Sequence, residues 1–209
     1  MHAAPPASAL DLGCGIGAVL MLVAWRFPSL CAVGVEAEAV SVDLARRSLA
    51  WNGAARRCAV VHGDLRDPAV LPAAARFDLV SGTPPYLPPG TATPSRGVQR
   101  GPAHLEYRGG IEAYCVAAAR WLGPGGRFVT CAAASQVTRV EGAARAAGLA
   151  IARRRDVIPR AGKPALFSVY AMRAGQGVEP ALDPPLVVRD AAGQRTPAFR
   201  ALRQAMGMP

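Results

Sequence analysis

Short apolar runs alternate with longer stretches of helical periodicity along most of the chain, and glycine or proline bounds most of the runs. This alternation is typical of an α/β protein with a mainly parallel sheet and helices on both faces. The pattern predicts seven strands, at residues 8–12, 30–35, 58–62, 77–81, 127–132, 149–157 and 165–172. It predicts helices at residues 17–26, 38–51, 110–122 and 135–147, the third of them stopped by the glycines and proline of 123–126.

Two segments depart from this rhythm. Residues 87–108 contain four prolines and three glycines without a clear period, and a connection of this length usually recognises a ligand. The alternative is a solvated loop. Residues 174–209 contain a short apolar run at 186–188 and a possible helix at 197–206. We expect them to form an appendage of the single domain that residues 1–173 make up.

The chain is strongly basic, with a formal net charge of +10 and a pI near 10.4. Such a charge favours a polyanionic partner, and nucleic acid is the natural candidate. However, 23 of the 24 basic residues are arginine, and a compositional bias of the genome would give the same excess. The charge alone therefore does not establish the partner.

Two groups of basic residues are candidates for binding phosphates. Arg96 and Arg100 belong to segment 87–108, directly after the residues that we interpret below as catalytic. Arg160 and Lys163 follow the arginines of 153–155 and are expected to contact substrate from the far side of the same crevice. A solvated strand edge explains the second group equally well.

Composition also bears on location and metal binding. The five cysteines are widely spaced within apolar runs, which indicates reduced core residues instead of disulfides or a zinc site. His62 and His104 lack neighbouring ligands, so we expect no metal. The most apolar stretch, residues 16–25, is too short to span a bilayer, and no signal segment is visible. We expect a cytoplasmic monomer without a membrane partner.

A glycine-rich turn follows the first predicted strand, in the sequence Asp11-Leu-Gly-Cys-Gly-Ile-Gly17. Gly13 and Gly15 let the backbone turn sharply and leave no side chain where a nucleoside would lie. Asp11 adds a carboxylate, which suits the sulfonium and amino groups of S-adenosylmethionine better than a pyrophosphate. The same residues also fit the dinucleotide pattern Gly-x-Gly-x-x-Ala, so the turn alone leaves a methyl donor and NAD both open.

Two further acids follow the next two predicted strands. Glu36 ends the run 30–35, where a carboxylate can accept hydrogen bonds from both hydroxyls of a ribose. Asp64 follows the third strand, at the place where the adenine of a nucleoside cofactor would lie. Because the carboxyl ends of parallel strands meet at one edge, we expect both acids to share a crevice with Asp11. Each acid alone is as consistent with a solvated strand end.

The fourth strand is followed by Thr83-Pro-Pro-Tyr86, which we interpret as the catalytic segment. Pro84 and Pro85 fix the backbone and point carbonyl groups in one direction, while Tyr86 offers a flat face for a base. Such a shelf can hold an exocyclic amine, whose methylation depends more on position than on a proton acceptor. Alternatively, the prolines only end the strand and Tyr86 belongs to the core.

Taken together, these motifs resemble the class I S-adenosylmethionine-dependent methyltransferases, specifically the bacterial valine-tRNA adenine-N6 methyltransferase family. Two narrower stretches extend the resemblance, Arg160-Ala-Gly-Lys-Pro164 and residues 185–196. The resemblance implies a Rossmann-like fold, S-adenosylmethionine as cofactor, and methyl transfer to adenine N6 in RNA, with tRNA as the partner. It also implies that Gly13 and Gly15 cradle the donor, that Glu36 binds its ribose and that Asp64 binds its adenine. Residues 83–86 would hold the target amine.

The chain departs from that family in two places. Thr83 stands where relatives usually carry Asn or Asp, and a threonine hydroxyl is shorter and can also donate a hydrogen bond. Relatives also have a longer segment before the first strand than residues 1–8. Two alternatives therefore stay open, namely methylation of a protein glutamine amide and a catalytically silent RNA-binding homologue. An NAD oxidoreductase fits less well, because no pair of residues suited to hydride transfer is visible.

Overall fold

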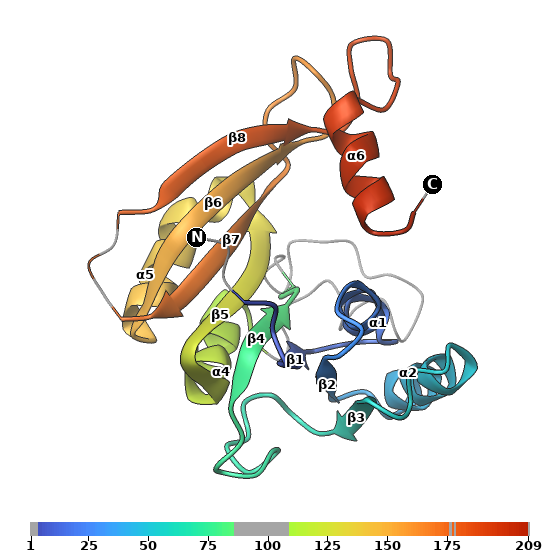
Figure 1. The fold of residues 1–209 in the computed structure, drawn as a ribbon. Helices are drawn as coiled ribbons and strands as arrows, with labels where there is room; N and C mark the ends of the chain where they lie inside the picture. The colour runs from blue at the N-terminus through green and yellow to red at the C-terminus, as the bar shows by residue number, and fades with distance from the viewer. Residues whose placement is uncertain (1–3, 86–108, 176, 178, 209) are drawn as a thin grey trace.

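The computed structural model describes residues 4–85, 109–175, 177 and 179–208, which form one sheet of eight strands (Figure 1). The order across the sheet is β3-β2-β1-β4-β5-β7-β6-β8. Strands β1 to β5 are parallel, β7 runs antiparallel to β5 and β6, and β8 is parallel to β6. The strands are β1 (Ser8–Leu12), β2 (Cys31–Glu36), β3 (Cys58–His62), β4 (Phe77–Gly82), β5 (Leu122–Ala133), β6 (Leu149–Ile158), β7 (Phe167–Ala174) and β8 (Ala181–Val187).

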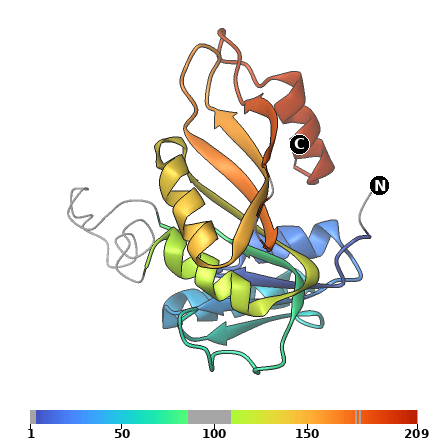
Figure 2. The same cartoon turned by 90° about the vertical axis from the view of Figure 1, so that its left-hand side faces the viewer.

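Helices cover both faces of the sheet, as predicted (Figures 1 and 2). Helices α1 (Ala18–Arg26) and α2 (Ala39–Trp51) lie on one face, and α4 (Ile111–Trp121) and α5 (Val137–Ala146) lie on the other. Side chains on β1 alternate between the two sides. Ala9 packs in the apolar cluster under α1 and α2, whereas Leu10 and Leu12 pack in the cluster under α4 and α5. The central strands are therefore buried on both faces, which explains their continuous apolar sequence.

All seven predicted strands and all four predicted helices are present, with small shifts at their ends. The largest difference is β5, which begins at Leu122 instead of residue 127. Glycine makes this extension possible, because a Cβ atom on Gly126 would lie 2.8 Å from the Phe77 carbonyl oxygen of β4. The helix predicted from residue 135 begins as a 3-10 turn (Ala134–Gln136) before α5.

The eighth strand, β8, lies in the segment that the sequence predicts as an appendage. It pairs with β6 from Arg153–Ala181 to Ile158–Val187, with a register shift between Arg155 and Val157. Prolines 184 and 185 argue against a strand, yet they are tolerated because β8 is an edge strand and they lie at this irregularity. The predicted helix near the C-terminus is confirmed as α6 (Pro197–Ala205).

Several expectations fall outside the described residues, namely the loop 87–108 with Arg96 and Arg100, and Tyr86 of the catalytic segment. The prediction that all cysteines are core residues is wrong for Cys31, which is exposed at the first position of β2. The alternation of side chains turns Cys31 away from the core in which its neighbour Ala32 is buried. None of the helices in the described ranges is long and apolar enough to cross a bilayer.

Candidate functional site

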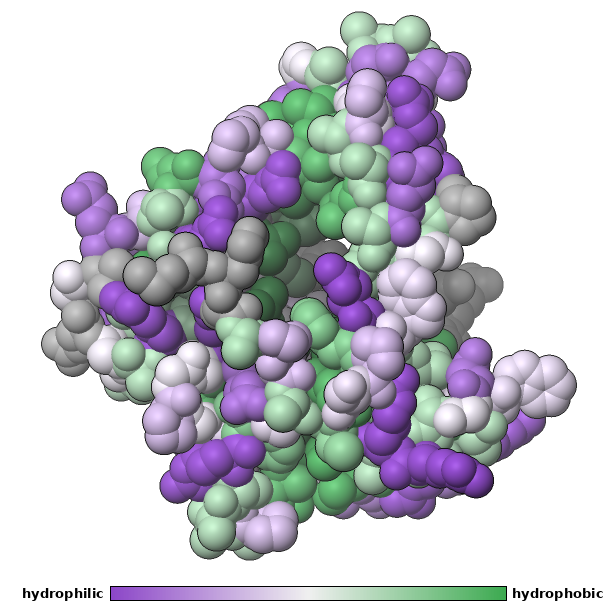
Figure 3. All heavy atoms as spheres, viewed as in Figure 1, coloured by the Kyte–Doolittle hydropathy of each residue, from purple (hydrophilic) through white to green (hydrophobic). Residues whose placement is uncertain are grey.

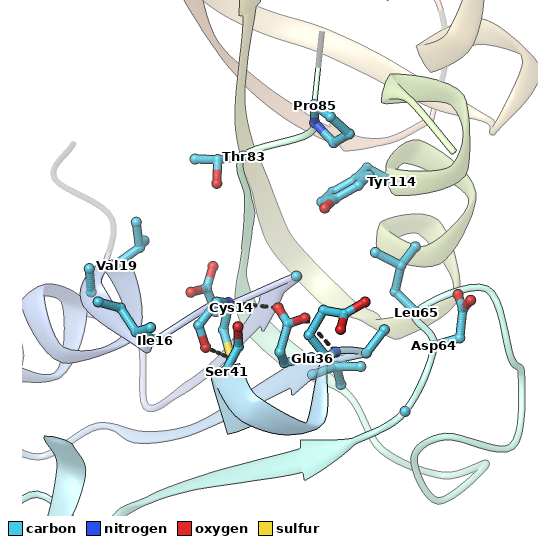
Figure 4. Close-up of a pocket in the computed structure, with 18 of the residues that line it drawn as sticks. Cys14, Ile16, Val19, Glu36, Ser41, Asp64, Leu65, Thr83, Pro85 and Tyr114 are labelled. Atoms are coloured by element: carbon cyan, nitrogen blue, oxygen red, sulfur yellow. Dashed lines mark hydrogen bonds between the residues drawn. The ribbon is translucent and has the colours of Figure 1, made fainter. Parts of the chain in front are cut away.

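A cavity of about 370 Å³ lies at the carboxyl ends of β1, β2, β3 and β4. Every residue predicted to bind the cofactor lines it, as Figure 4 shows for Glu36 and Asp64. This convergence follows from the parallel strands, because each strand delivers the residues after it to the same edge. The predicted residues that line it are Asp11, Gly13, Gly15, Glu36, Asp64, Thr83 and Pro85.

The glycine turn between β1 and α1 forms the floor of the cavity. Gly13 has φ +62° and Gly15 has φ +55°, a left-handed conformation that favours glycine. A Cβ atom on Gly15 would meet no atom within 4 Å, so the backbone there faces open space. A Cβ atom on Gly13 would instead collide with the hydroxyl of Tyr114. The turn therefore offers bare backbone to a ligand, as a nucleoside cofactor requires.

Glu36 ties the glycine turn to the start of the next helix. One carboxylate oxygen accepts a hydrogen bond from the Gly15 backbone N–H, and the other accepts one from the Glu38 backbone N–H, both at 2.8 Å. An ionised carboxylate has about four acceptor positions, so each oxygen keeps capacity for a ribose hydroxyl. Glu36 is thus placed to hold both the turn and a nucleoside.

Asp11 is a buried carboxylate beside this turn. It is 4% exposed, and its Oδ1 accepts a hydrogen bond of 2.8 Å from the Ser81 hydroxyl on β4. Burial is the largest influence and raises its pKa to about 6, against which the Ser81 hydrogen bond acts. A buried carboxylate of this kind is stabilised when a cation binds next to it.

Asp64 lies at the rim of the cavity and is held by a neighbour. Its carboxylate accepts hydrogen bonds from the Arg66 guanidinium, the shortest at 2.6 Å, and from the Arg66 backbone N–H at 2.9 Å. The pair is partly exposed, so its contribution to stability is small. The side chain is in the predicted place, but part of its accepting capacity is already used.

The predicted catalytic segment reaches the opposite wall of the cavity. Figure 4 shows Thr83 and Pro85 across from the glycine turn, with the Thr83 hydroxyl pointing toward it. Both residues line the cavity, whereas Pro84 is buried behind them. Thr83 and Pro85 therefore face the space above the glycine turn.

Tyr114 of α4 is a site residue that the sequence analysis missed. Its side chain lines the cavity between Thr83 and Asp64 in Figure 4 and is only 6% exposed. Its ring also fills the space where a Cβ atom on Gly82 would lie, 2.6 Å from the ring. Burial, followed by the charges of the acids lining the cavity, raises its pKa, so the phenol stays protonated. Tyr114 thus lies between the glycine turn and the wall that Thr83 and Pro85 line, which we call the proline shelf.

The electrostatics of the cavity decide which cofactor fits. Four carboxylates line it, and no lysine or arginine among the described residues does. These acids are Asp11, Glu36, Glu38 and Asp64. Such a site attracts a ligand with sulfonium and ammonium charges and repels the two phosphates of NAD. The residues present therefore fit S-adenosylmethionine.

The two predicted phosphate-binding residues in the described part of the chain, Arg160 and Lys163, do not line the cavity. Arg160 and Lys163 lie in the turn between β6 and β7. Arg153 pairs with Asp183 at 2.6 Å and Arg154 pairs with Asp156 at 2.9 Å, which largely neutralises those two arginines. The described residues contain no group of three or more side chains suited to a metal ion.

Comparisons with known proteins agree with this site. Residues 9–89 match the model of a methyltransferase domain. The chain carries a methyltransferase domain. The crystal structure of a "predicted O-methyltransferase" from Agrobacterium tumefaciens superposes with a TM-score of 0.69 at 21% identity, covering 97% of this chain and 91% of that one. The predicted class I methyltransferase fold is thereby confirmed, and the match over residues 9–89 agrees with the predicted methyltransferase class.

Relatives that act on different substrates are similar to this chain. A tRNA1(Val) (adenine(37)-N6)-methyltransferase of Porphyromonas gingivalis is 30% identical over 125 residues, 59% of this chain and 48% of that protein. A release factor glutamine methyltransferase of Caulobacter vibrioides is 32% identical over 148 residues, 68% of this chain and 50% of that protein. The chain thus spans about half the length of these relatives, and the substrate has to be argued from the site.

Glu36→Gln is expected to weaken binding of S-adenosylmethionine by about 2 kcal/mol, roughly thirtyfold. Glutamine has one accepting oxygen, so one of the two backbone N–H groups that Glu36 satisfies would face an amide N–H. Isothermal titration calorimetry measures the change, and NAD should give no binding heat to the parent protein. Glu38→Gln is the control, because it removes the same charge from the cavity wall. Equal losses in both variants would contradict a specific role of Glu36.

Proposed function

We propose that this protein transfers a methyl group from S-adenosylmethionine to N6 of an adenine in RNA, and that the RNA is a tRNA. The observation that carries the proposal is a cavity that combines four carboxylates, a bare glycine turn and a proline shelf opposite it. The carboxylates and the glycine turn suit a cationic nucleoside donor. The proline shelf suits a planar acceptor nitrogen.

The donor half of the cavity has a role for each residue. S-adenosylmethionine supplies an electrophilic methyl group on a sulfonium. The carboxylate of Glu36 would accept hydrogen bonds from the ribose hydroxyls while it keeps the Gly15 turn in place. Asp64, at the rim, would meet the adenine, and the buried charge of Asp11 would stabilise the cationic end of the donor.

The acceptor half depends on positioning. An adenine amine has a lone pair delocalised into its ring, and hydrogen bonds from its protons to carbonyl oxygens help to localise that pair for attack. On this wall the Thr83 hydroxyl and the backbone carbonyls of Thr83 and Pro85 would be the acceptors. The chemistry then needs an aligned nitrogen more than a strong base.

The distribution of charge supports RNA as the substrate. Residues 1–85, which form most of the donor site, contain seven basic and seven acidic residues. Residues 149–209 contain ten basic and four acidic residues. A neutral donor half and a basic C-terminal part suit an enzyme that binds its polyanionic substrate away from the acid-lined cavity.

A second candidate is methylation of a protein glutamine amide. The similarity to release factor glutamine methyltransferases favours it, because a proline shelf holds a planar amide as well as an adenine amine. Mass spectrometry of nucleosides separates the candidates, after incubation of unmodified tRNA with isotope-labelled S-adenosylmethionine. Labelled N6-methyladenosine supports the proposal. Label in a glutamine-containing release factor and not in tRNA supports the second candidate, and label in neither supports a silent homologue.

Thr83→Asn is expected to raise the rate of methyl transfer to tRNA about tenfold, the value of one added hydrogen bond in the transition state. The asparagine side chain is longer than that of threonine, so its amide oxygen can come closer to the amine. That oxygen only accepts hydrogen bonds, whereas the threonine hydroxyl can also donate one. Thr83→Val keeps the shape, removes the hydroxyl and is expected to lower the rate by a similar factor. Single-turnover rates with saturating donor measure both. A rate unchanged in both variants would show that residue 83 does not touch the acceptor.

A further inference from the structure

The direction of the last strands brings the C-terminal segments to the edge of the sheet that holds the cavity. Strand β7 is antiparallel to both β5 and β6, so β6 runs in the direction of β5. Strand β8 is parallel to β6. The residues after β6 and after β8 therefore leave the sheet at its carboxyl edge, as Thr83 does after β4.

Backbone hydrogen bonds join these two segments into one unit. The Ala161 N–H donates to the Arg189 carbonyl at 2.8 Å, and the Val188 N–H donates to the Ile158 carbonyl at 2.8 Å. An isolated bridge between Arg189 and Arg195 closes the second segment into a tight turn. The two stretches that carry the narrower family resemblance are thus neighbours in space.

Five basic side chains gather on this unit, and we call them the basic rim. All five are exposed, and none forms an ion pair with an acid in the described part of the chain. Arg160 and Arg189 meet at Gly193, where a Cβ atom would lie 3.4 Å from the Arg160 guanidinium and whose carbonyl accepts from Arg189 at 2.7 Å. The members of the basic rim are Arg160, Lys163, Arg189, Arg195 and Arg200.

Helix α6 fixes the basic rim next to the donor half of the molecule. The Thr196 hydroxyl caps the helix by accepting from the Phe199 N–H, and the Arg200 guanidinium donates to the Arg195 carbonyl. After the helix, Gly207 packs against the indole of Trp25 at the end of α1. Figure 3 shows hydrophilic side chains along α6, above an apolar hollow between α6 and α1. The segment that carries the basic rim is thus held against the donor half through α6 and Trp25.

We infer that the basic rim binds the phosphate backbone of the RNA substrate and positions it over the cavity. This inference rests on the proposed function and adds the surface by which the substrate is held. Arginine suits the task, because its planar guanidinium donates two parallel hydrogen bonds to a phosphate. Phosphate contacts fix register and orientation and carry no sequence information, so base selection would remain with residues 83–85.

The test compares two double variants that remove the same charge. Arg160→Ala with Arg195→Ala changes the basic rim, whereas Arg47→Ala with Arg56→Ala removes two exposed arginines of α2 and the loop after it. Fluorescence anisotropy with an unmodified valine tRNA transcript gives Kd at several salt concentrations. The rim variant is expected to bind about tenfold or more weakly at 0.1 M salt, with a salt slope flatter by about 1.4 to 1.8. The control should keep the parent slope.

Calorimetry with S-adenosylmethionine shows whether each variant is folded. Because neither double substitution touches the cavity, the affinity for the donor should not change. Equal slopes and affinities in the two double variants, with tRNA still methylated, would overturn the role of the basic rim and leave the proposed function intact. A parent protein that neither binds nor methylates tRNA would overturn both.

Discussion

Asp11→Asn is expected to abolish binding of S-adenosylmethionine and, at the same time, to make the protein more stable at neutral pH. The substitution keeps the shape of the side chain and an oxygen that can accept from Ser81. It removes a buried charge, and no lysine or arginine of the described residues lines the cavity beside it. Because the pKa of Asp11 is raised from 3.8 to about 6, the ionised form costs about 3 kcal/mol at pH 7, and the variant recovers this amount.

The pH dependence follows from the same shift. Between pH 4 and 6 the folded protein binds more protons at Asp11 than the unfolded chain does, so this group lowers the free energy of unfolding as pH rises through that window. Above pH 6, Asp11 is ionised in both states and no longer changes the free energy of unfolding with pH. In contrast, donor affinity should fall as pH drops through 6, because binding a cation favours the ionised carboxylate.

Urea unfolding at pH 5 and pH 7.5, with calorimetry of donor binding, measures both effects. The matched control is Asp78→Asn on β4, where the carboxylate is exposed and accepts hydrogen bonds from the backbone N–H groups of Ala7 and Ser8 at 2.8 and 3.0 Å. That variant should lose stability and keep its donor affinity. An Asp11→Asn protein that is less stable at pH 7.5, or that still binds the donor tightly, would contradict the interpretation of Asp11.

Gly13→Ala is expected to inactivate the protein, and Tyr114→Phe is expected to restore part of what is lost. The added methyl group would collide with the Tyr114 hydroxyl in a turn that already requires φ +62°. Removing that hydroxyl leaves the ring carbon Cζ as the nearest atom, at 3.4 Å, an ordinary contact. The double variant should therefore be more stable than Gly13→Ala alone, with a coupling energy of about 1 to 3 kcal/mol.

Gly15→Ala distinguishes collision from backbone strain. Gly15 has a similar left-handed φ of +55°, but a methyl group there would meet nothing within 4 Å. Its stability cost, about 1 kcal/mol for an L-residue in this conformation, should not change when Tyr114→Phe is added. The free energies of unfolding are measured for each alanine variant with and without Tyr114→Phe. An equal rescue of both alanine variants would show that Tyr114 does not set the position of the turn.

Most of the sheet could be predicted from sequence because its central strands are buried on both faces. Among them, β1 is buried at every position after Ser8, and its bounds agree with the prediction. The bounds of the edge strand β3 also agree, because a short apolar run forms most of it. Strand β8 could not be predicted in the same way. Its sequence contains two prolines and only one buried residue, Leu186, because it pairs along one edge and contributes little to the core.

The donor side of the site was predictable for a related reason. Acids directly after parallel strands must meet at one edge, so Asp11, Glu36 and Asp64 could be placed without coordinates. Tyr114 could not, because an aromatic residue on the apolar side of a helix reads as ordinary core. The contact that reveals its role, with Gly13 and Gly82, joins three segments distant in sequence.

The prolines of β8 have a consequence for how molecules of this protein meet one another. An unpaired strand edge is a template on which a second chain can add a strand, and growth of this kind leads to aggregates. In β8 the exposed residues Pro184 and Pro185 have no backbone N–H, so the strand lacks two of its backbone donors. A strand from a second molecule could therefore form only an interrupted set of backbone hydrogen bonds with β8, which makes intermolecular pairing at this edge less favourable.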